Sequence, residues 1–280
     1  MRHFHPTHFW EEECSISDIV YSAVKKETSW SEWVNLTTSR DHIGAINRYL
    51  QYCNDPEFAQ LEPDRKVFAF TNGLYNIETN QFTEYAIANT SPEFNTVVAV
   101  RLFDIPFNPE FAMCSDWRDI STPEFDSIFD YQEFGPIALE WGCALCGRIL
   151  YEVGEHDNWQ VGLFIKGIAG SGKSTIGNMM KYLYPPDRVG TLSSNGEDIF
   201  GLSALYDKLM YACTEVKKDF ALNQGDWQSM ISGEEVSIAR KHRTALSTKW
   251  KVPGLLCGNE LPKWVDAAGS VVRRLIIFEF

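Results

Sequence analysis

A glycine-rich segment in the second half of the chain has the spacing of a phosphate-binding loop. Residues 167–174 read Gly-Ile-Ala-Gly-Ser-Gly-Lys-Ser and match the pattern G-x-x-x-x-G-K-[ST]. Glycines leave backbone N–H groups free to point at phosphate oxygens, and a following helix directs its positive end at the same charge. The segment predicts binding of a nucleoside triphosphate by Gly167, Ile168, Ala169, Gly170, Ser171, Gly172, Lys173, Ser174 and Thr175.

Two side chains of this loop are expected to act directly on the nucleotide. Lys173 would reach the outer phosphates, and the Ser174 hydroxyl would ligate Mg²⁺. The alternative is a glycine-rich turn that matches the pattern by chance. An apolar strand-like run over 161–166 and a helical pattern over 174–184 favour the nucleotide site.

Two more polar residues follow apolar runs in the same half. Glu215 ends the run that begins at Leu209, and a carboxylate there can orient the attacking water and support the metal. Asn259 follows the run from Leu255 and can contact the terminal phosphate. The alternatives are an acid at an exposed strand end and an asparagine in a turn.

Basic residues of the second half form two groups that could meet phosphate charge. Arg273 and Arg274 are adjacent, and an arginine beside a terminal phosphate stabilises transition-state charge, although most such pairs are solvated. A run without acids also contains the basic residues Arg240, Lys241, Arg243, Lys249 and Lys251. The alternative for this run is a solvated basic turn.

Composition first seems to argue against a nucleic-acid partner. The 280 residues carry 25 basic and 38 acidic side chains, a net charge of −13. These divide into 10 basic and 23 acidic residues before position 151, and 15 of each sign after it. The second half is therefore neutral and can hold a local basic surface, whereas the acidic half is expected to face partners other than DNA.

The remaining composition is that of an ordinary globular protein. Hydrophobic residues make up 44% and charged residues 22%, which excludes a disordered, collagen-like or disulfide-rich chain. The sequence has neither a signal peptide nor an apolar run long enough for a membrane span. Its seven scattered cysteines are typical of reduced thiols, so we expect an intracellular protein that is not secreted.

Two sets of residues have metal-ligand chemistry but weak patterns. Cys143 and Cys146 form a C-x-x-C inside a helix-like stretch, where core thiols are favoured over zinc ligands. His3, His5 and His8 gather at the N-terminus, where an exposed, frayed end is the simpler interpretation.

The rhythm of elements predicts an α/β core in the second half. Strands are expected over 161–166, 209–213, 252–258 and 271–280, and helices over 174–184, 197–205 and 222–231. Strands that alternate with helices predict a mostly parallel sheet, here that of a P-loop NTPase. A basic, hairpin-like segment lies between the last helix and the strand from Val252.

The first half is expected to be mixed and largely helical. Helices are predicted over 15–55 and 124–151, a strand and hairpin over 67–85 with the turn signal Asn72-Gly73, and another strand over 96–103. We therefore expect a helical extension over 1–60, an α+β domain over 61–153 and the NTPase core over 154–280. A polar hinge over 154–160 would mark the last boundary.

Four blocks in order resemble the superfamily 3 helicases of DNA viruses, above all the poxvirus-type and giant-virus primase-helicases that also occur in phages. The blocks are Gly167–Thr175, Met210–Glu215, Ser232–Lys241, and Asn259-Glu-Leu-Pro with Asp266 and Arg273-Arg274. Phe70-Thr-Asn-Gly-Leu-Tyr75 and the segment from Tyr131-Gln132 to Leu150 look similar to the domain before the helicase core. The resemblance is strong over 160–280 and weaker from residue 60 to there.

This resemblance implies an AAA+-like ATPase that assembles as a ring, usually of six subunits, and moves on single-stranded or forked DNA in viral replication. ATP and Mg²⁺ would bind at Gly167–Thr175 and Glu215, and Asn259 would sense the nucleotide. Lys241, with His242 and Arg243, would contact DNA. Arg273 or Arg274 would reach the neighbouring ATP site. An attached primase domain or other replication proteins are implied partners, within the infected host cell and without a membrane.

Some features depart from this family. Thr214 stands where many members have the first of two acids, and Asp219 is a possible substitute. The sequence stops at Phe280 inside an expected strand, which suggests a fragment of a longer protein. Residues 1–60 hold no acidic motif for a primase site. Two alternatives stay open: another P-loop enzyme such as a kinase, and a non-hydrolysing DNA-binding module.

Overall fold

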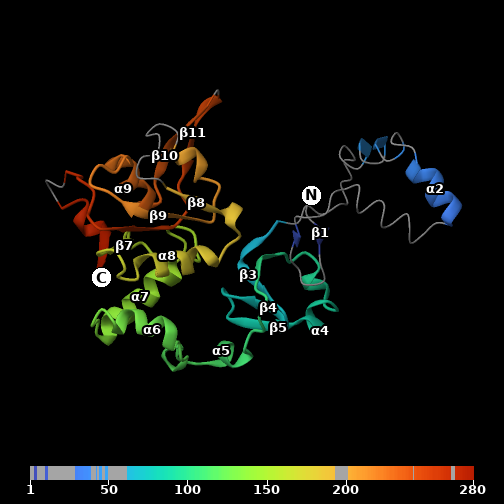
Figure 1. Ribbon diagram of the computed structural model, residues 1–280, viewed down its shortest axis with the longest axis horizontal. Helices are drawn as coiled ribbons and strands as arrows, with labels where there is room; N and C mark the ends of the chain where they lie inside the picture. Colours follow the sequence, from blue (N-terminus) through green and yellow to red (C-terminus); the bar gives the residue numbers. More distant parts are fainter. Residues whose placement is uncertain are drawn as a thin grey trace. The chain divides into compact units, whose positions relative to one another are not determined.

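The computed structural model describes residues 3–4, 10–11, 29–38, 42, 44–45, 48–49, 62–192, 201–241, 243–265 and 269–280. The chain divides into two compact units, Met1–Met113 and Cys114–Phe280 (Figure 1). Each unit has a sheet of its own, and each is described by itself. Across the described residues, no helix has the length and apolar character needed to cross a membrane.

The first unit is built around a four-stranded sheet. Its strands are β3 (Asp64–Phe70), β4 (Gly73–Asn76), β5 (Gln81–Glu84) and β6 (Ala99–Leu102), in the order β5-β4-β3-β6. The antiparallel pairs β3–β4 and β4–β5 confirm the hairpin predicted around Asn72-Gly73, and β6 runs parallel to β3. Two short elements, α4 (Tyr85–Ala88) and η1 (Pro92–Phe94), connect β5 with β6, and α5 (Pro109–Met113) follows β6.

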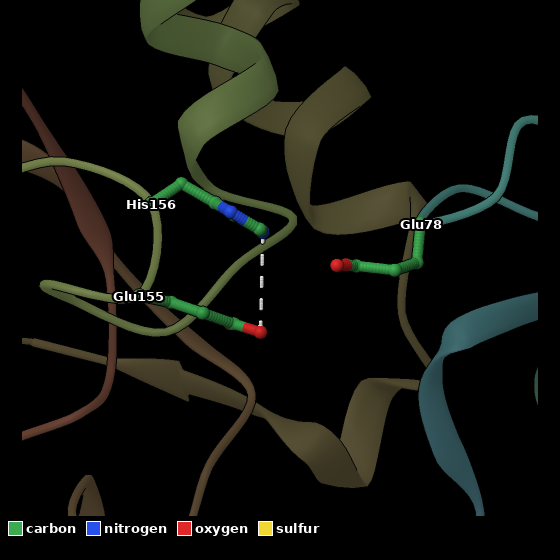
Figure 2. Close-up of side chains that lie close together, drawn as sticks. All are labelled: Glu78, Glu155 and His156. Carbon is green, nitrogen blue, oxygen red and sulfur yellow. Dashed lines mark ion pairs between the residues drawn. The ribbon is translucent and has the colours of Figure 1, made fainter.

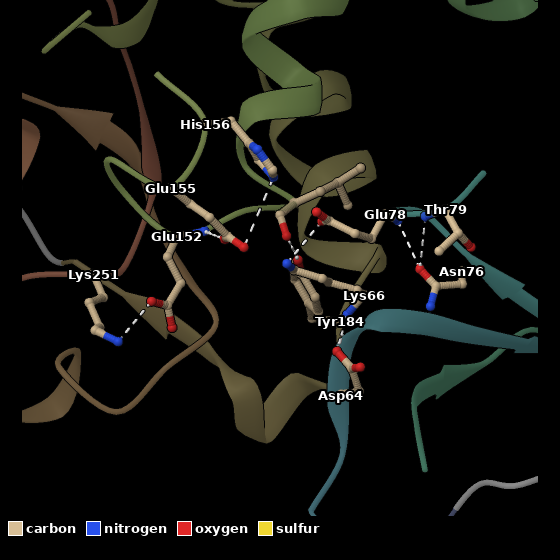
Figure 3. Close-up of polar contacts among 11 residues, drawn as sticks. Asp64, Lys66, Asn76, Glu78, Thr79, Glu152, Glu155, His156, Tyr184 and Lys251 are labelled. Atoms are coloured by element: carbon tan, nitrogen blue, oxygen red, sulfur yellow. Dashed lines mark hydrogen bonds and ion pairs between the residues drawn. The ribbon is translucent and has the colours of Figure 1, made fainter. Parts of the chain in front are cut away.

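The two faces of this sheet differ because side chains alternate along each strand. One face carries the small core of Val67, Ala69, Leu74, Ala88 and Ala99. The other carries aromatic rings, with Phe107 within 5.0 Å of the rings of Phe70, Tyr75 and Phe82. The same unit contains the ion pair of Lys66 with Glu78 at 2.9 Å (Figure 3).

Little of the N-terminal extension is described. The pair β1 (His3–Phe4) and β2 (Trp10–Glu11) is antiparallel, and α2 (Trp30–Thr38) lies within the region predicted to be helical. His5 and His8 lie outside the described residues, as does the side chain of His3.

The second unit contains the parallel sheet predicted from the sequence. Its five strands are β7 (Gly162–Lys166), β8 (Val189–Thr191), β9 (Met210–Val216), β12 (Gly254–Gly258) and β13 (Leu275–Glu279). All neighbours in the order β13-β7-β12-β9-β8 are parallel. The apolar runs of β7, β9 and β12 are buried because elements cover both faces of these inner strands.

Helices and a hairpin cover the two faces of this sheet (Figure 1). Helices α6 (Pro123–Asp130), α7 (Pro136–Arg148) and α8 (Lys173–Tyr182) lie on the face of Leu163 and Ile165. Helix α9 (Gln224–Ser232) and the hairpin of β10 (Glu235–Arg240) and β11 (Arg243–Lys249) pack on the face of Phe164 and Leu256. Single turns complete the unit: η2 (Trp117–Asp119), η3 (Pro186–Arg188), η4 (Gly201–Ala204) and η5 (Val272–Arg274).

Some predicted elements differ in detail. The helix expected over 124–151 is two helices, and Glu133 between them has the left-handed φ of 57°. Of the helix expected over 197–205, only the short turn η4 is described. The strand expected from Val271 begins at Leu275, because η5 comes first.

The structural division of the chain differs from the boundary expected at residue 154. Helices α6 and α7 belong with the core because the ring of Phe129 packs edge-on against Phe278 at 5.9 Å. Arg148 holds the expected polar hinge in place. It forms two ion-paired hydrogen bonds with Asp157, of 2.6 and 2.8 Å, and it donates another hydrogen bond to the Val161 carbonyl. The polar residues 154–160 are therefore a connection that is bonded to the core of the second unit, and they do not separate the two units.

Further contacts fix the same connection between α7 and β7. Glu152 forms an ion pair with Lys251 at 2.9 Å, and the Val153 N–H donates to the Lys251 carbonyl (Figure 3). Figure 2 shows the neighbouring pair Glu155 and His156, whose Oε1 and Nε2 atoms are 4.0 Å apart. Glu78, also drawn there, belongs to the first unit.

Candidate nucleotide-binding site

The loop between β7 and α8 has a backbone path that requires glycine at three positions. Gly170 and Gly172 have φ of 83° and 96°, in the left-handed region that other residues rarely adopt. Gly167 has an ordinary φ, but a Cβ there would overlap the carbonyl oxygen of Phe280. The glycines that the sequence pattern singled out therefore each have a physical reason.

Lys173 begins helix α8 and lies folded onto the loop. Its side chain is buried, and Nζ donates a hydrogen bond to the Ile168 carbonyl and lies 3.4 Å from Ser171 Oγ. Ser174 and Thr175 follow at the exposed N-terminal end of the helix. The ammonium group and the positive end of α8 thus converge on the loop, which favours an anion there.

The α6–α7 turn supports the loop from outside. Gln132 Nε2 donates to the Ser171 carbonyl at 2.9 Å, and a Cβ on Gly172 would lie 3.6 Å from Ile128 Cγ2. These contacts tie the loop to a segment far away in the sequence. Sequence reasoning gave Gln132 no role, because nothing in its spacing connects it with residue 171.

The loop forms one side of a pocket of about 720 Å³, within the usual size range of small-molecule sites. Strands β9 and β12 supply the other side, because the C-terminal ends of parallel strands meet at one edge of the sheet. The lining residues are Ala169, Gly170, Lys173, Ser174, Thr214, Glu215, Val216, Lys217, Gly258, Asn259 and Glu260.

The register of the strands explains how Asn259 and Glu215 reach this pocket. Gly258 at the end of β12 pairs with Lys166 of β7 on one side and Val216 of β9 on the other. Asn259 therefore emerges beside the start of the loop, where the Gly167 N–H donates to the Gly258 carbonyl at 3.1 Å. Glu215 lies within β9 and is exposed to the pocket.

The pocket also contains residues that the sequence analysis did not identify. Lys217 stands two positions after Glu215 and is exposed on the pocket wall, and Glu260 lies next to Asn259. The adjacent Lys218 is absent from the lining and pairs with Glu260 at 2.6 Å. The alternation of side chains along a strand would have placed Lys217 with Glu215. Asp219, the suggested substitute acid, does not line the pocket.

The oxygen ligands of the site fit Mg²⁺. The hydroxyl of Ser174 and the carboxylate of Glu215 line the same pocket, and hard oxygen donors of this kind are what Mg²⁺ prefers. By contrast, burial raises the pKa of the Cys146 thiol to about 12 and also raises that of Cys143, which keeps both protonated. Within the described residues, neither thiol belongs to a group of three metal-ligating side chains.

The two arginines of η5 have opposite surroundings, and neither lines the pocket. Arg274 is buried; its Nη1 donates to the Ser270 carbonyl at 2.8 Å, and its Nε lies 3.4 Å from Ser232 Oγ. Arg273 is exposed. Leu275 pairs with Gly162 at the beginning of β7, so both arginines lie at the opposite end of the sheet from the loop. Asp266 lies outside the described residues.

The basic segment forms the predicted hairpin, with a buried base and an exposed tip that projects from the unit (Figure 1). Val236 and Ile238 lie in the core. Arg240 lies opposite Arg243 in the register of the two strands. Its guanidinium donates two hydrogen bonds to the Thr244 carbonyl, at 2.9 and 3.1 Å. Lys241 and Arg243 are exposed, and His242 lies outside the described residues.

Two known families match different parts of the chain. Residues 2–127 match a family described as D5 N terminal like, and residues 165–274 match a family of unknown function, DUF5906. With its glycine loop, its parallel sheet and its pocket at the strand ends, the second unit has an α/β core of the P-loop NTPase type.

Two solved structures also resemble the chain. An apo structure of the NrS-1 C-terminal region is 15% identical, with a TM-score of 0.43, and the match covers 76% of this chain and 58% of that one. A structure of JCV helicase with a bound phenoxyphenyl acetamide is 19% identical, with a TM-score of 0.30, covering 43% and 36%. The chain thus spans 58% of the length of the NrS-1 region that it matches.

Proposed function

We propose that this chain contains the ATP-hydrolysing motor of a superfamily 3 DNA helicase that acts in viral DNA replication. The observation that carries the proposal is the shared pocket of Lys173, Ser174, Glu215 and Asn259 at the ends of three parallel strands. The match of residues 2–127 to the D5 N terminal like family, the N-terminal domain of primase-helicases, supports the replicative role and the infected cell as its location.

Each pocket residue has a distinct part in hydrolysis. Loop N–H groups and Lys173 hold the β- and γ-phosphates, and the lysine exchanges its bond to the Ile168 carbonyl for phosphate oxygen. Glu215 orients a water molecule and accepts its proton as the water oxygen attacks the γ-phosphorus. The bond from that phosphorus to the β–γ bridging oxygen breaks, which gives ADP and inorganic phosphate. Asn259 donates its amide N–H to a γ-phosphate oxygen.

Magnesium fits the oxygen ligands on the wall of this pocket. Ser174 and Glu215 are the residues that would hold it, and when bound it neutralises charge on the outer phosphates. The acid that many related enzymes have before Glu215 is replaced by Thr214, so Glu215 has the roles of water orientation and metal support together.

Placement of the arginines supports an AAA+-like ring in which subunits complete each other's sites. Arg273 is exposed at the end of the sheet away from its own loop, so it serves the nucleotide of a neighbouring subunit. Arg274 is committed to Ser270 and Ser232 inside its own subunit. We therefore assign the trans-acting arginine to Arg273, in a ring that we expect to be a hexamer.

The hairpin is the proposed DNA contact. Arg240 fastens the tip by its bonds to Thr244, while Lys241 and Arg243 remain exposed for the phosphates of single-stranded or forked DNA. The buried base links the tip to the core that carries the nucleotide pocket. ATP hydrolysis can thereby be coupled to movement of the hairpin.

The decisive experiment measures phosphate release from ATP, with and without single-stranded DNA. We expect Lys173→Ala to abolish turnover, and Lys241→Ala to keep basal turnover but lose stimulation by DNA. Lys251→Ala is the matched control, because Lys251 belongs to the same basic run but is paired with Glu152. Turnover that needs a phosphate acceptor would instead indicate a kinase, and the absence of turnover would indicate a non-hydrolysing module.

A further inference from the structure

A second hollow, of about 660 Å³, adjoins the phosphate loop between α6 and α8. We call it the α6–α8 hollow; it is lined by Thr122, Pro123, Glu124, Phe125, Ser127, Ile128, Thr175 and Met179. Thr175 directly follows Ser174 of the nucleotide pocket, and Met179 lies one helical turn further on the same face of α8. The hollow therefore begins where the phosphate loop ends.

The walls of the hollow suit a flat heterocycle. Pro123, Phe125, Ile128 and Met179 present apolar surface, and Phe125 and Ile128 are only half-buried. Two of the hydroxyls already donate within α6, Thr122 Oγ1 to Asp126 at 2.8 Å and Ser127 Oγ to the Glu124 carbonyl at 2.8 Å. Glu124 and Thr175 add a carboxylate and a hydroxyl to the lining, but its apolar side chains make packing the main interaction that these walls offer.

Three contacts fix the position of α6 relative to the phosphate loop. Gln132, beyond the end of α6, bonds to the Ser171 carbonyl, and Ile128 lies beside Gly172. The Phe129 ring packs edge-on against that of Phe280, with centroids 6.0 Å apart. A ligand held by the loop thus meets the α6–α8 hollow at a defined distance.

We propose that the base of the nucleoside triphosphate binds in the α6–α8 hollow, against Ile128 and Met179. This assignment rests on the proposed triphosphate site and adds the part of the substrate that the loop does not hold. In the bound nucleotide the γ-phosphate faces Glu215 and Asn259, and the nucleoside extends from the loop past Thr175 into the hollow. Because the base is held mainly by packing, the site distinguishes weakly between the two purines and binds ATP and GTP within tenfold of each other.

The test compares the binding of ATP with that of inorganic tripolyphosphate, which has no base, by titration calorimetry on the full chain. Wild type should bind ATP more tightly than tripolyphosphate. Met179→Gln puts an amide into the apolar wall at nearly constant size and should weaken ATP roughly tenfold, with tripolyphosphate unchanged. Asn178→Gln, on the exposed neighbouring position, should change neither.

Unchanged tripolyphosphate binding shows that the Met179→Gln variant is folded. Three results would overturn the base assignment alone. They are an equal loss of affinity for ATP and tripolyphosphate in Met179→Gln, an unchanged affinity of that variant for ATP, and a more than hundredfold difference between the affinities of wild type for ATP and GTP. If tripolyphosphate binds as tightly to Lys173→Ala as to wild type, or does not bind to wild type, the phosphate site itself fails and the proposed function fails with it.

Discussion

Replacing Arg273 and Arg274 one at a time by alanine separates stability from catalysis. Arg274 donates one hydrogen bond of 2.8 Å from a charged group to a carbonyl and is 8% exposed, with a second, longer contact to Ser232. A hydrogen bond of a charged group contributes about 1.5–3 kcal/mol, so we expect Arg274→Ala to lower the free energy of unfolding by about 2–3 kcal/mol. In a unit of this size, that corresponds to about 4–12 °C in Tm.

Arg273→Ala should behave in the opposite way. Because Arg273 is exposed, its loss should change the free energy of unfolding by less than about 0.5 kcal/mol and Tm by about 1–2 °C. Its ATPase activity in the assembled ring should nevertheless fall about 10³-fold or more, because the trans contact is lost.

Thermal unfolding followed by circular dichroism and the ATPase rate of mixed rings measure the two effects. Rings that combine Arg273→Ala subunits with Glu215→Gln subunits should recover part of the activity. An Arg273→Ala subunit keeps its own Glu215, and it receives an intact arginine wherever its neighbour is a Glu215→Gln subunit. Equal Tm shifts for the two arginine variants would refute the structural argument. Mixed rings that recover nothing would refute the trans assignment of Arg273.

Three further predictions test the pocket and its support. Gly172→Ala forces a residue with a Cβ to a φ of 96°, which costs about 1–2 kcal/mol, and should weaken ATP binding roughly tenfold in a calorimetric titration; unchanged affinity would contradict the strained-loop argument. Lys217→Ala should raise the KM for ATP at least fivefold, whereas Lys218→Ala should leave it unchanged because Lys218 lies outside the pocket lining. The same KM for both variants would contradict a role of Lys217 in the site. Partial burial alone would raise the pKa of Asp157, but its bonds from Arg148 and from the Trp159 N–H lower it overall. Asp157→Asn should therefore cost about 2 kcal/mol at pH 7, and urea unfolding should show this difference shrinking as the pH falls below the unfolded carboxyl pKa of about 3.9; a difference independent of pH would contradict the ion-pair explanation.

Local patterns were sufficient for the elements that carry the site. The glycine loop, the parallel strands and the basic hairpin each have a signature within ten residues, because phosphate geometry, strand alternation and turn chemistry act over that range. Lys173, Ser174, Glu215 and Asn259 could be selected as candidates for the same reason, and the structure brings all four to one pocket.

The boundary between the two structural units could not be predicted as well from local composition. The polar stretch after Tyr151 resembled a linker, yet Arg148 and Asp157 bind it to the core. The helices before it pack on the last strand through Phe129 and Phe278. Such aromatic contacts join positions far apart in the chain, and neither sequence spacing nor polarity indicates them.

The sequence by itself predicted the type of chemistry, since the spacing of glycines before a lysine is typical of a loop that holds phosphates. The structure adds that Gly170 and Gly172 have the left-handed φ that such a loop needs. Only the tertiary structure decided which neighbours share in it. The order of the strands puts Asn259 between the loop and Glu215, and burial separates Arg274 from the adjacent Arg273. The α6–α7 segment meets the loop through Gln132 and Ile128. These are long-range contacts, and they form because parallel strands and packed helices bring together residues that the sequence keeps apart.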